Sequence, residues 1–255
     1  MSLDADGRKV HAGAPIYEPA EVGRLVGLTP SRVRRWLFGY QYRVGAEKRE
    51  KKQVPVIRRR GSERSRYASF LDLIELLSVK SFLDRGLSLQ RVRRACNEAA
   101  SVLKVDHPFA RRRFFTSGRE IYLEIRENRS ASNLLQLLSG GQWVIEPIIR
   151  EFAEQIDFDL DTDLASKWWP LGKDAFVVLD PQVSFGAPSI IGKGVKTANV
   201  YDLFRAERGN EDVVGAWMRL TTAEVQAAVR FARKTRPPFL FRVPPSGGKL
   251  DVIPL

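Results

Sequence analysis

The fold is decided by residues 17–37, which read YEPAEVGRLVGLTPSRVRRWL. Pro19 suits the first position of a helix, and three apolar residues then recur at the spacing of one helix face, namely Val22, Leu25 and Val26. Gly27 can adopt the left-handed conformation that ends a helix, while Thr29 and Pro30 are typical of the cap and first position of the next one. The stretch therefore predicts a helix-turn-helix, two short helices joined by a tight turn.

The second predicted helix has one apolar face and one basic face. The apolar face would pack against the first helix and contains Val33, Trp36 and Leu37. The rest of its surface has a hydroxyl and three arginines, with no acidic residue: Ser31, Arg32, Arg34 and Arg35. Arginine can hold guanine or phosphate through two parallel hydrogen bonds, so this face suits a DNA groove, with Thr29 at the start of the helix. A solvated basic face is the alternative.

A hairpin is predicted directly after this helix. Gln41–Val44 and Val54–Arg58 have the length of short strands, and the charged stretch Gly45–Lys52 would form the tip between them. A hairpin in this position is a wing. It leads into a run of basic residues followed by a tyrosine, which are Arg58, Arg59, Arg60, Arg64, Arg66 and Tyr67. We expect so many like charges to be exposed and to need an anionic partner.

Two further helices follow the arginine run. Ser69 and Asp72 have the spacing of a capping box at the start of the first, which ends near Gly86. Ser88 opens the second, and Cys96 lies on its apolar face, which predicts a buried thiol rather than a reactive one. As the single cysteine, it also excludes an internal disulfide and a cysteine-based zinc site.

The charge of the chain is concentrated in its N-terminal part. The net charge is +12, and residues 1–113 hold 25 Lys and Arg against 12 Asp and Glu, or +13. Residues 114–175 amount to −5 and residues 176–255 to +4. The basic excess therefore indicates a polyanionic partner for the first part, and the acidic middle is better suited to contacts between proteins.

Residues 15–105 resemble the DNA-binding domain of MerR-type regulators. The resemblance rests on the helix-turn-helix, the wing, the Arg66-Tyr67 pair, and two helices separated by Gly-Leu-Ser-Leu at 86–89. It implies that Arg34, Arg35 and the wing arginines touch DNA and that Tyr67 steadies a phosphate contact. The chain departs from that family at Pro108, where a long dimerising coiled coil is expected, and it has no inducer-binding cysteines.

The acidic middle of the chain, residues 114–175, has sequence patterns that predict secondary structure less specifically. Strands are predicted over Phe114–Ile125, and helices over Leu134–Leu138 and Ile145–Ile156. The aspartates of Asp157–Asp163 fit an edge strand better than a calcium loop, because the required glycine and glutamate are missing. Trp168-Trp169 is predicted to be core or interface.

The C-terminal part begins with strands and turns and ends in helices. Phe176–Leu179 is predicted to be a strand, and Gly192–Gly194 a tight turn rather than a phosphate loop. Three short helices are predicted around Ala198–Glu207, Asp212–Met218 and Thr222–Lys234, the last with a capping box formed by Thr221 and Glu224.

Residues 180–235 resemble a small helical domain of unassigned function that recurs in bacterial antitoxins of the VapB type. The matching order is Gly-x-Pro, Gly-x-Gly-Val, Thr, Leu-Thr, Glu-Val and Ala. With both modules together, the whole chain is similar to the larger VapB-type antitoxins. The resemblance implies pairing with a PIN-like ribonuclease toxin and repression of the chain's own operon.

The predicted fold is mainly α with small β elements (α+β). Its three parts are a winged helix-turn-helix over 1–107, an acidic connecting region over 108–175, and strands with a three-helix module and a basic arm over 176–255. Neither His11 nor His107 has a partner at catalytic or metal-ligand spacing, so no enzyme activity, metal or cofactor is expected. Without a membrane span or a secretory segment, the expected location is the cytoplasm.

The leading hypothesis is a DNA-binding antitoxin of a type II toxin-antitoxin system. Its expected partners are double-stranded operator DNA, a PIN-like toxin and a second copy of itself, because a dimer would read a palindrome. The residues expected to bind the toxin are basic and lie near the C-terminus: Arg233, Lys234, Arg236 and Arg242. The alternatives are a stand-alone MerR-like regulator with a ligand-sensing or oligomerising C-terminal part, and a nucleic-acid-processing enzyme.

Overall fold

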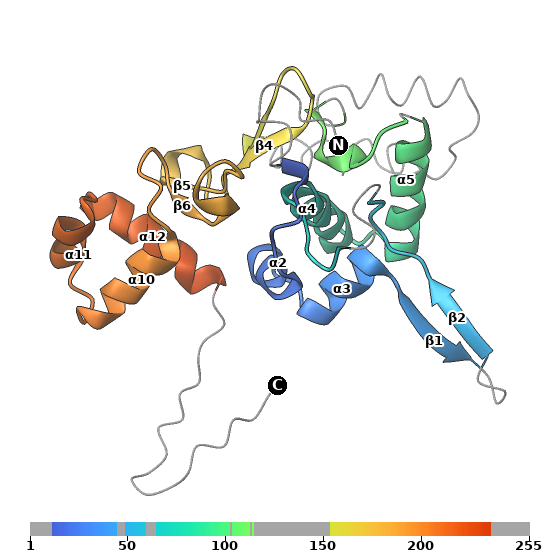
Figure 1. Cartoon of the computed structure of the whole chain (residues 1–255), viewed down its shortest axis with the longest axis horizontal. Helices are drawn as coiled ribbons and strands as arrows, with labels where there is room; N and C mark the ends of the chain where they lie inside the picture. The colour runs from blue at the N-terminus through green and yellow to red at the C-terminus, as the bar shows by residue number, and fades with distance from the viewer. Residues whose placement is uncertain are drawn as a thin grey trace, which may run out of the picture.

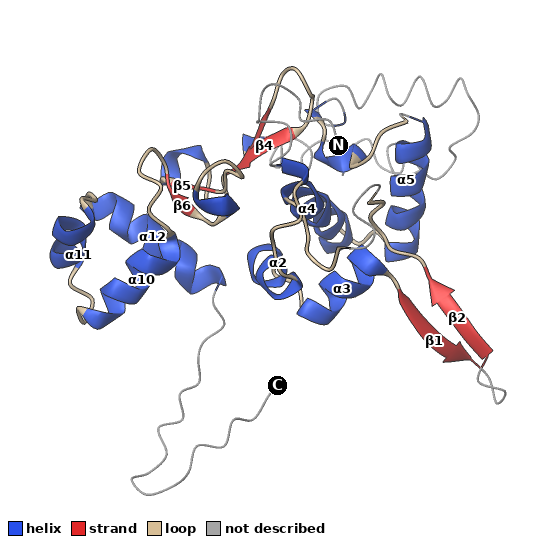
Figure 2. Ribbon diagram, viewed as in Figure 1, coloured by secondary structure: helices blue, strands red, loops and turns tan. Residues whose placement is uncertain are grey.

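The computed structural model describes residues 12–44, 49–59, 65–102, 104–112, 114 and 154–235. In these ranges helices predominate, and the sheets are small antiparallel pairs of two strands, as Figure 2 shows. The predicted α+β class is therefore confirmed. The described helices gather in two groups joined by the short strands, with α2 to α5 in one group and α10 to α12 in the other (Figure 1).

The two predicted N-terminal helices are present. Helix α2 spans Pro19–Val26 and α3 spans Pro30–Phe38, and Gly27 between them has the left-handed φ of 74°. The Thr29 hydroxyl accepts a hydrogen bond from the Arg32 N–H, which caps α3. Local sequence determines both ends, so this part of the prediction is confirmed.

The hairpin is present, but its second strand lies earlier than predicted. Strand β1 spans Tyr40–Val44 and pairs antiparallel with β2, which spans Arg49–Gln53. The prediction of a strand over Val54–Arg58 is wrong. Val56 and Ile57 are instead buried under α3, where both backbone N–H groups donate to the Trp36 carbonyl. Burial of these two apolar side chains outweighs their preference for a strand.

Helices α4 and α5 pack beside this unit. Helix α4 spans Phe70–Asp84, begins with the predicted capping box of Ser69 and Asp72, and contacts α5, which spans Leu89–Val102. The short helix η1 over Pro108–Ala110 packs against α4, with the ring of Phe109 5.4 Å from that of Phe82. The chain just after residue 107 therefore packs with the N-terminal helices.

In the middle of the chain, strand β3 spans Ile156–Phe158 and pairs with β4 over Ala165–Trp168. The edge strand predicted over Asp157–Asp163 is thus shorter than expected, because the carboxylate of Asp159 accepts the N–H groups of Asp161 and Thr162 and closes a turn. Trp168 and Trp169 are buried, as predicted. The predictions for residues 115–153 lie outside the described residues.

The C-terminal part contains the predicted strand, turn and helices. Its elements are η2 Lys173–Ala175, β5 Val177–Val178, η3 Ser184–Gly186, β6 Ser189–Ile190, α10 Thr197–Ala206, α11 Glu211–Met218 and α12 Thr222–Thr235. Strand β5 pairs with β6, and α12 packs on α10 and α11. The capping box of Thr221 and Glu224 is confirmed by reciprocal hydrogen bonds.

The two groups of helices are joined by a buried contact at Tyr17. Its backbone pairs with Ala68, which precedes α4, and its hydroxyl donates to the carbonyl of Gly186 at 2.8 Å. Gly186 has a left-handed φ of 73°, and a Cβ there would collide with the Tyr17 hydroxyl. The N-terminal and C-terminal groups therefore share one continuous core.

Candidate nucleic-acid interface

Helix α3 exposes the basic face that its sequence predicts. Val33, Trp36 and Leu37 are buried. Ser31, Arg32, Arg34 and Arg35 are exposed. The Thr29 hydroxyl lies 3.2 Å from the Ser31 hydroxyl, which orders the first turn of the helix. No acidic residue belongs to α3, so its guanidinium groups meet no counter-charge from their own helix.

Two exposed tyrosines, Tyr40 and Tyr42, connect α3 to the hairpin, and neither was among the predicted contacts. The Arg35 guanidinium lies 5.2 Å from the centre of the Tyr40 ring, and the Tyr40 and Tyr42 rings are 5.7 Å apart. A cation over an aromatic ring is held without losing its charge. The alternation Tyr-Gln-Tyr at 40–42, which places both rings on one face of β1, was the available signal.

The hairpin is basic along its second strand. Arg49, Lys51 and Lys52 are exposed on β2. On β1, Arg43 pairs with Glu50 across the hairpin at 3.3 Å, with both side chains more than half exposed. The hairpin therefore adds cationic side chains next to α3, and Lys51 and Lys52 were not among the predicted contacts.

Arg59 corrects the expectation that the whole arginine run is exposed. Its side chain is 3% exposed, and its Nε donates to the Asp72 carboxylate at 2.9 Å. The other two guanidinium nitrogens donate to the carbonyls of Ser65 and Tyr67. The prediction is wrong for Arg59 because a buried carboxylate at the start of α4 neutralises it, and that pairing is not visible in local sequence.

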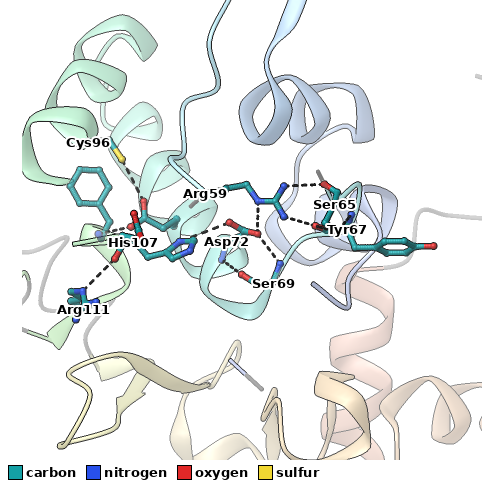
Figure 3. Close-up of polar contacts among 11 residues, drawn as sticks. Arg59, Ser65, Tyr67, Ser69, Asp72, Cys96, His107 and Arg111 are labelled. Atoms are coloured by element: carbon teal, nitrogen blue, oxygen red, sulfur yellow. Dashed lines mark hydrogen bonds and ion pairs between the residues drawn. The ribbon is translucent and has the colours of Figure 1, made fainter. Parts of the chain in front are cut away.

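Arg59 thereby positions the segment that follows the arginine run. Figure 3 shows its guanidinium between Asp72 on one side and Ser65 and Tyr67 on the other, with the Tyr67 ring directed away from this cluster. Tyr67 is 48% exposed, and Arg66 beside it is exposed. Arg58 is exposed as well, while Arg60 and Arg64 lie outside the described residues.

A second buried carboxylate lies further along α4. Glu75 accepts the Phe109 N–H at 2.6 Å, and the Cys96 thiol lies 3.6 Å from its other oxygen. Burial raises the pKa of Glu75 to about 8, against the lowering effect of these hydrogen bonds. Burial likewise raises the pKa of the Cys96 thiol, and Glu75 beside it adds to the rise. Cys96 is therefore the buried core thiol that the sequence predicts.

His107 lies beside Asp72, on the side opposite Ser65 and Tyr67 (Figure 3). Its Nδ1 is 3.9 Å from the Asp72 carboxylate, and burial lowers its pKa although Asp72 and Asp106 act in the opposite direction. His107 thus lies next to Asp72 in the segment leading into η1, but its Nδ1 makes no hydrogen bond to that carboxylate. In the described part of the chain, no three His, Cys, Asp or Glu side chains are grouped so as to hold a metal ion.

A cavity of about 570 Å³ lies between α2 and the C-terminal helices. Glu21 and Arg24 line it from α2, and Lys196, Phe231 and Thr235 line it from the other side. Burial raises the pKa of Glu21, although Arg24 acts to lower it. The cavity places the end of α12 close to α2.

The residues predicted to bind a toxin are only partly within the described structure. Arg233 and Lys234 are exposed in the last turn of α12, and the Arg233 guanidinium lies 5.7 Å from the centre of the Phe204 ring. Arg236 and Arg242 lie outside the described residues. Over the described ranges, none of the helices is both long enough and apolar enough to cross a membrane.

Comparisons of the sequence with known proteins give one family match and two relatives. Residues 177–232 match a family model described as "Protein of unknown function (DUF433)". The chain is 27% identical over 202 residues to a protein of Mycobacterium tuberculosis (strain ATCC 25618 / H37Rv) named "Putative antitoxin VapB45", covering 75% of this chain and 83% of that protein. It is 24% identical over 234 residues to "Uncharacterized protein Rv2308" of the same strain, covering 87% and 91%.

The fold is similar to a solved structure. The X-ray crystal structure of Rv2018 from Mycobacterium tuberculosis superposes with a TM-score of 0.61 at 23% sequence identity. The match covers 85% of this chain and 97% of that one. The arrangement of the two groups of helices is therefore found in a protein whose structure is known.

Proposed function

We propose that this chain is the antitoxin of a type II toxin-antitoxin system that binds operator DNA and represses its own operon. The observation that carries the DNA-binding part is the exposed face of α3, where Arg32, Arg34 and Arg35 stand without an acidic neighbour on the helix. In this proposal α2, α3 and the β1–β2 hairpin act as a winged helix-turn-helix, with α3 in the major groove.

The other predicted contacts have separate roles in this proposal. Arg34 and Arg35 read base edges, because bidentate arginine discriminates guanine. Arg58, Arg66, Lys51 and Lys52 contact phosphates, which supply affinity and make it fall steeply with salt. Arg59 contacts no DNA and acts by holding the Tyr67 carbonyl, so that Tyr67 and Arg66 are presented to the backbone.

The antitoxin part is supported by similarity to the protein named "Putative antitoxin VapB45", which extends over 75% of this chain. We propose a PIN-like ribonuclease as the partner. Such nucleases hold magnesium with clustered carboxylates, and the basic residues at and after the end of α12, namely Arg233, Lys234, Arg236 and Arg242, have the charge to bind that site. In this proposal the chain dimerises on a palindromic operator and is not itself an enzyme.

DNA binding is tested with the Arg34→Ala/Arg35→Ala variant on DNA from upstream of the gene. Each lost bidentate contact costs about 1–3 kcal/mol, so specific affinity should fall by tenfold or more, while affinity for unrelated DNA changes less. Arg94→Ala, which removes an exposed arginine from α5, is the matched control and should bind as wild type does. Equal operator affinity of the double variant and the control would contradict the assignment of α3.

Toxin binding is tested by co-expression with the product of the adjacent gene. The two proteins should co-purify, and purified wild-type chain should inhibit the nuclease while showing no magnesium-dependent nuclease activity alone. Changing Arg233, Lys234, Arg236 and Arg242 to alanine should weaken inhibition. Undiminished inhibition by this variant would rule out the arm as the inhibitory element.

A further inference from the structure

The turn between α2 and α3 occurs a second time in this chain, between α11 and α12. Adding 192 to the residue numbers places Gly23 on Gly215, Leu28 on Leu220 and Thr29 on Thr221. Val22 and Val33 likewise fall on Val214 and Val225, so five residues of the two turns are identical. All four valines are completely buried.

The backbone hydrogen bonds of the two turns are the same. The Gly23 carbonyl accepts the N–H groups of Gly27 and Leu28, and the Gly215 carbonyl accepts those of Arg219 and Leu220. The residue that ends the first helix is left-handed in both cases, with φ of 74° at Gly27 and 55° at Arg219. The two helix pairs are therefore joined by the same turn.

The start of the second helix also matches. The Thr29 hydroxyl accepts the Arg32 N–H at 3.3 Å, and the Thr221 hydroxyl accepts the Glu224 N–H at 3.3 Å. A Cβ on Gly23 would lie 2.6 Å from the Leu28 carbonyl oxygen, and one on Gly215 would lie 2.8 Å from that of Leu220. Both turns thus need glycine for the same close approach between the first helix and the chain after it.

Lys193 holds the second turn in place. Its ammonium donates to the Arg219 carbonyl at 2.7 Å and to the Glu224 carboxylate at 2.8 Å. Desolvation would raise the pKa of Glu224, but the hydrogen bonds from Lys193 and Thr221 lower it below its usual value. The single carboxylate of α12 is thereby directed away from the exposed face, and the Gly192–Gly194 turn gains a structural role.

When the two turns are aligned, the exposed surface of α12 begins at the same position as that of α3. From its start to residue 230, α12 exposes uncharged and basic side chains only: Thr222, Ala223, Gln226 and Arg230. Gln226 occupies the position of Arg34 in α3, and its amide nitrogen donates to Glu211 at 2.7 Å in an exposed hydrogen bond. A glutamine amide can both donate to and accept from adenine, and Arg230 can reach a phosphate.

We propose that α11 and α12 form a second DNA-binding helix-turn-helix, with the first half of α12 in the major groove. The repeated turn and the absence of an exposed acidic residue on α12 favour double-stranded DNA over a protein partner. The cavity lined by both α2 and the end of α12 places this unit beside the first one. The inference does not require that α3 bind DNA.

The test uses the full-length chain and a duplex enriched by the wild-type protein from a random 40-base-pair pool, a length of about four helical turns. Affinity and the protected footprint are measured for Gln226→Ala/Arg230→Ala, for Arg34→Ala/Arg35→Ala, and for Arg205→Ala as control. Arg205 is an exposed arginine of α10 in the same module. The α12 variant should bind about tenfold or more weakly and lose part of the footprint, while the control should not.

Other outcomes separate this inference from the proposed function. In one, the α12 variant binds with wild-type affinity and footprint while the α3 variant binds more weakly. That result overturns the inference that α11 and α12 bind DNA and leaves the proposed role of α3 standing. If the α12 variant loses DNA binding and the α3 variant does not, the second unit is supported and the assignment of α3 as a DNA-binding helix is contradicted. If the α12 variant retains DNA binding but becomes monomeric by light scattering, α12 contacts a second copy and the inference is wrong. Thermal melts of each variant exclude unfolding as the cause.

Discussion

At the scale of single residues, the buried charges of α4 explain what the arginine run does. Arg59 lies in a run of arginines that the sequence predicts to be exposed. Its side chain is nevertheless buried, because it forms an ion pair with Asp72, while the neighbouring Arg58 is exposed. Local sequence predicts an exposed patch because the residues of the run are adjacent, but the partner of Arg59 is a carboxylate 13 residues later in the chain, at the start of α4. The exposed arginines of α3 could be predicted because helix periodicity alone separates them from the buried face.

Arg59→Ala should lower the free energy of unfolding by about 3–5 kcal/mol, because it leaves the Asp72 carboxylate buried without its cation. Chemical denaturation of the purified chain measures this. Arg58→Ala is the matched control and should change stability by less than about 0.5 kcal/mol, because Arg58 is exposed. Equal stabilities of the two variants would show that the ion pair contributes nothing.

Glu75 should make the chain less stable as pH rises. Its pKa of about 8 in the fold exceeds its ordinary value of 4.5, so the folded state binds more protons than the unfolded chain between these pH values. The free energy of unfolding therefore falls from pH 4.5 to pH 8. His107, with its lowered pKa, acts in the opposite direction around and below pH 6.5, and Glu21, with its raised pKa, acts in the same direction as Glu75, so a comparison with a Glu75 variant is needed to isolate this group.

The check is a series of denaturation curves between pH 6.5 and 8 for wild type and Glu75→Gln. The glutamine keeps an oxygen for the Phe109 N–H but cannot ionise. Its unfolding free energy should fall less than that of wild type over this interval. Parallel pH profiles would mean that Glu75 is already ionised in the folded protein.

At the scale of secondary structure, the sequence predicts helices better than strands. Caps and apolar periodicity placed α2, α3, α4 and the three C-terminal helices close to their observed bounds. The second strand of the hairpin was missed because Arg49–Gln53 contains no apolar residue, whereas Val54–Arg58 contains three β-branched residues, which favour a strand. The repeated turn was readable from the start, since residues 22–33 align with 214–225 without a gap.

Gly23→Ala and Gly215→Ala should each destabilise the chain by about 1–3 kcal/mol, as overpacking does. Alanine is otherwise favoured over glycine in a helix by about 1 kcal/mol, so the sign of the effect reports the clash with the carbonyls of Leu28 and Leu220. Thermal or chemical denaturation measures it. Gly13→Ala, with nothing within 4 Å of the added Cβ, is the control and should be neutral or slightly stabilising.

At the scale of the whole molecule, one tyrosine joins the two groups of helices. The two groups could be predicted separately, because each has its own periodic helices and caps. Their docking could not, because its contacts, such as the hydrogen bond from Tyr17 to Gly186 and the core shared by both groups, join residues far apart in the sequence. Burial is the main cause of a raised pKa at Tyr17, so its hydroxyl stays protonated and able to donate.

Tyr17→Phe should lower the free energy of unfolding by about 1–3 kcal/mol, because the Gly186 carbonyl loses its buried donor. Amide hydrogen exchange should increase around Gly186 in this variant, which locates the effect at the junction. Tyr40→Phe removes a hydroxyl from an exposed ring and serves as the control. A Tyr17→Phe variant as stable as this control would show that the junction does not depend on the hydroxyl.

The contact between Tyr17 and Gly186 also orders events during protein synthesis. Its two ends are 169 residues apart, so at 5–20 residues per second Tyr17 leaves the ribosome roughly ten to thirty seconds before its acceptor. A product that stops short of Gly186 contains all of α2, α3 and α4 but lacks the acceptor of the Tyr17 hydroxyl. Interrupted translation before Gly186 thus yields a fragment in which the N-terminal helices cannot make this contact with the C-terminal group.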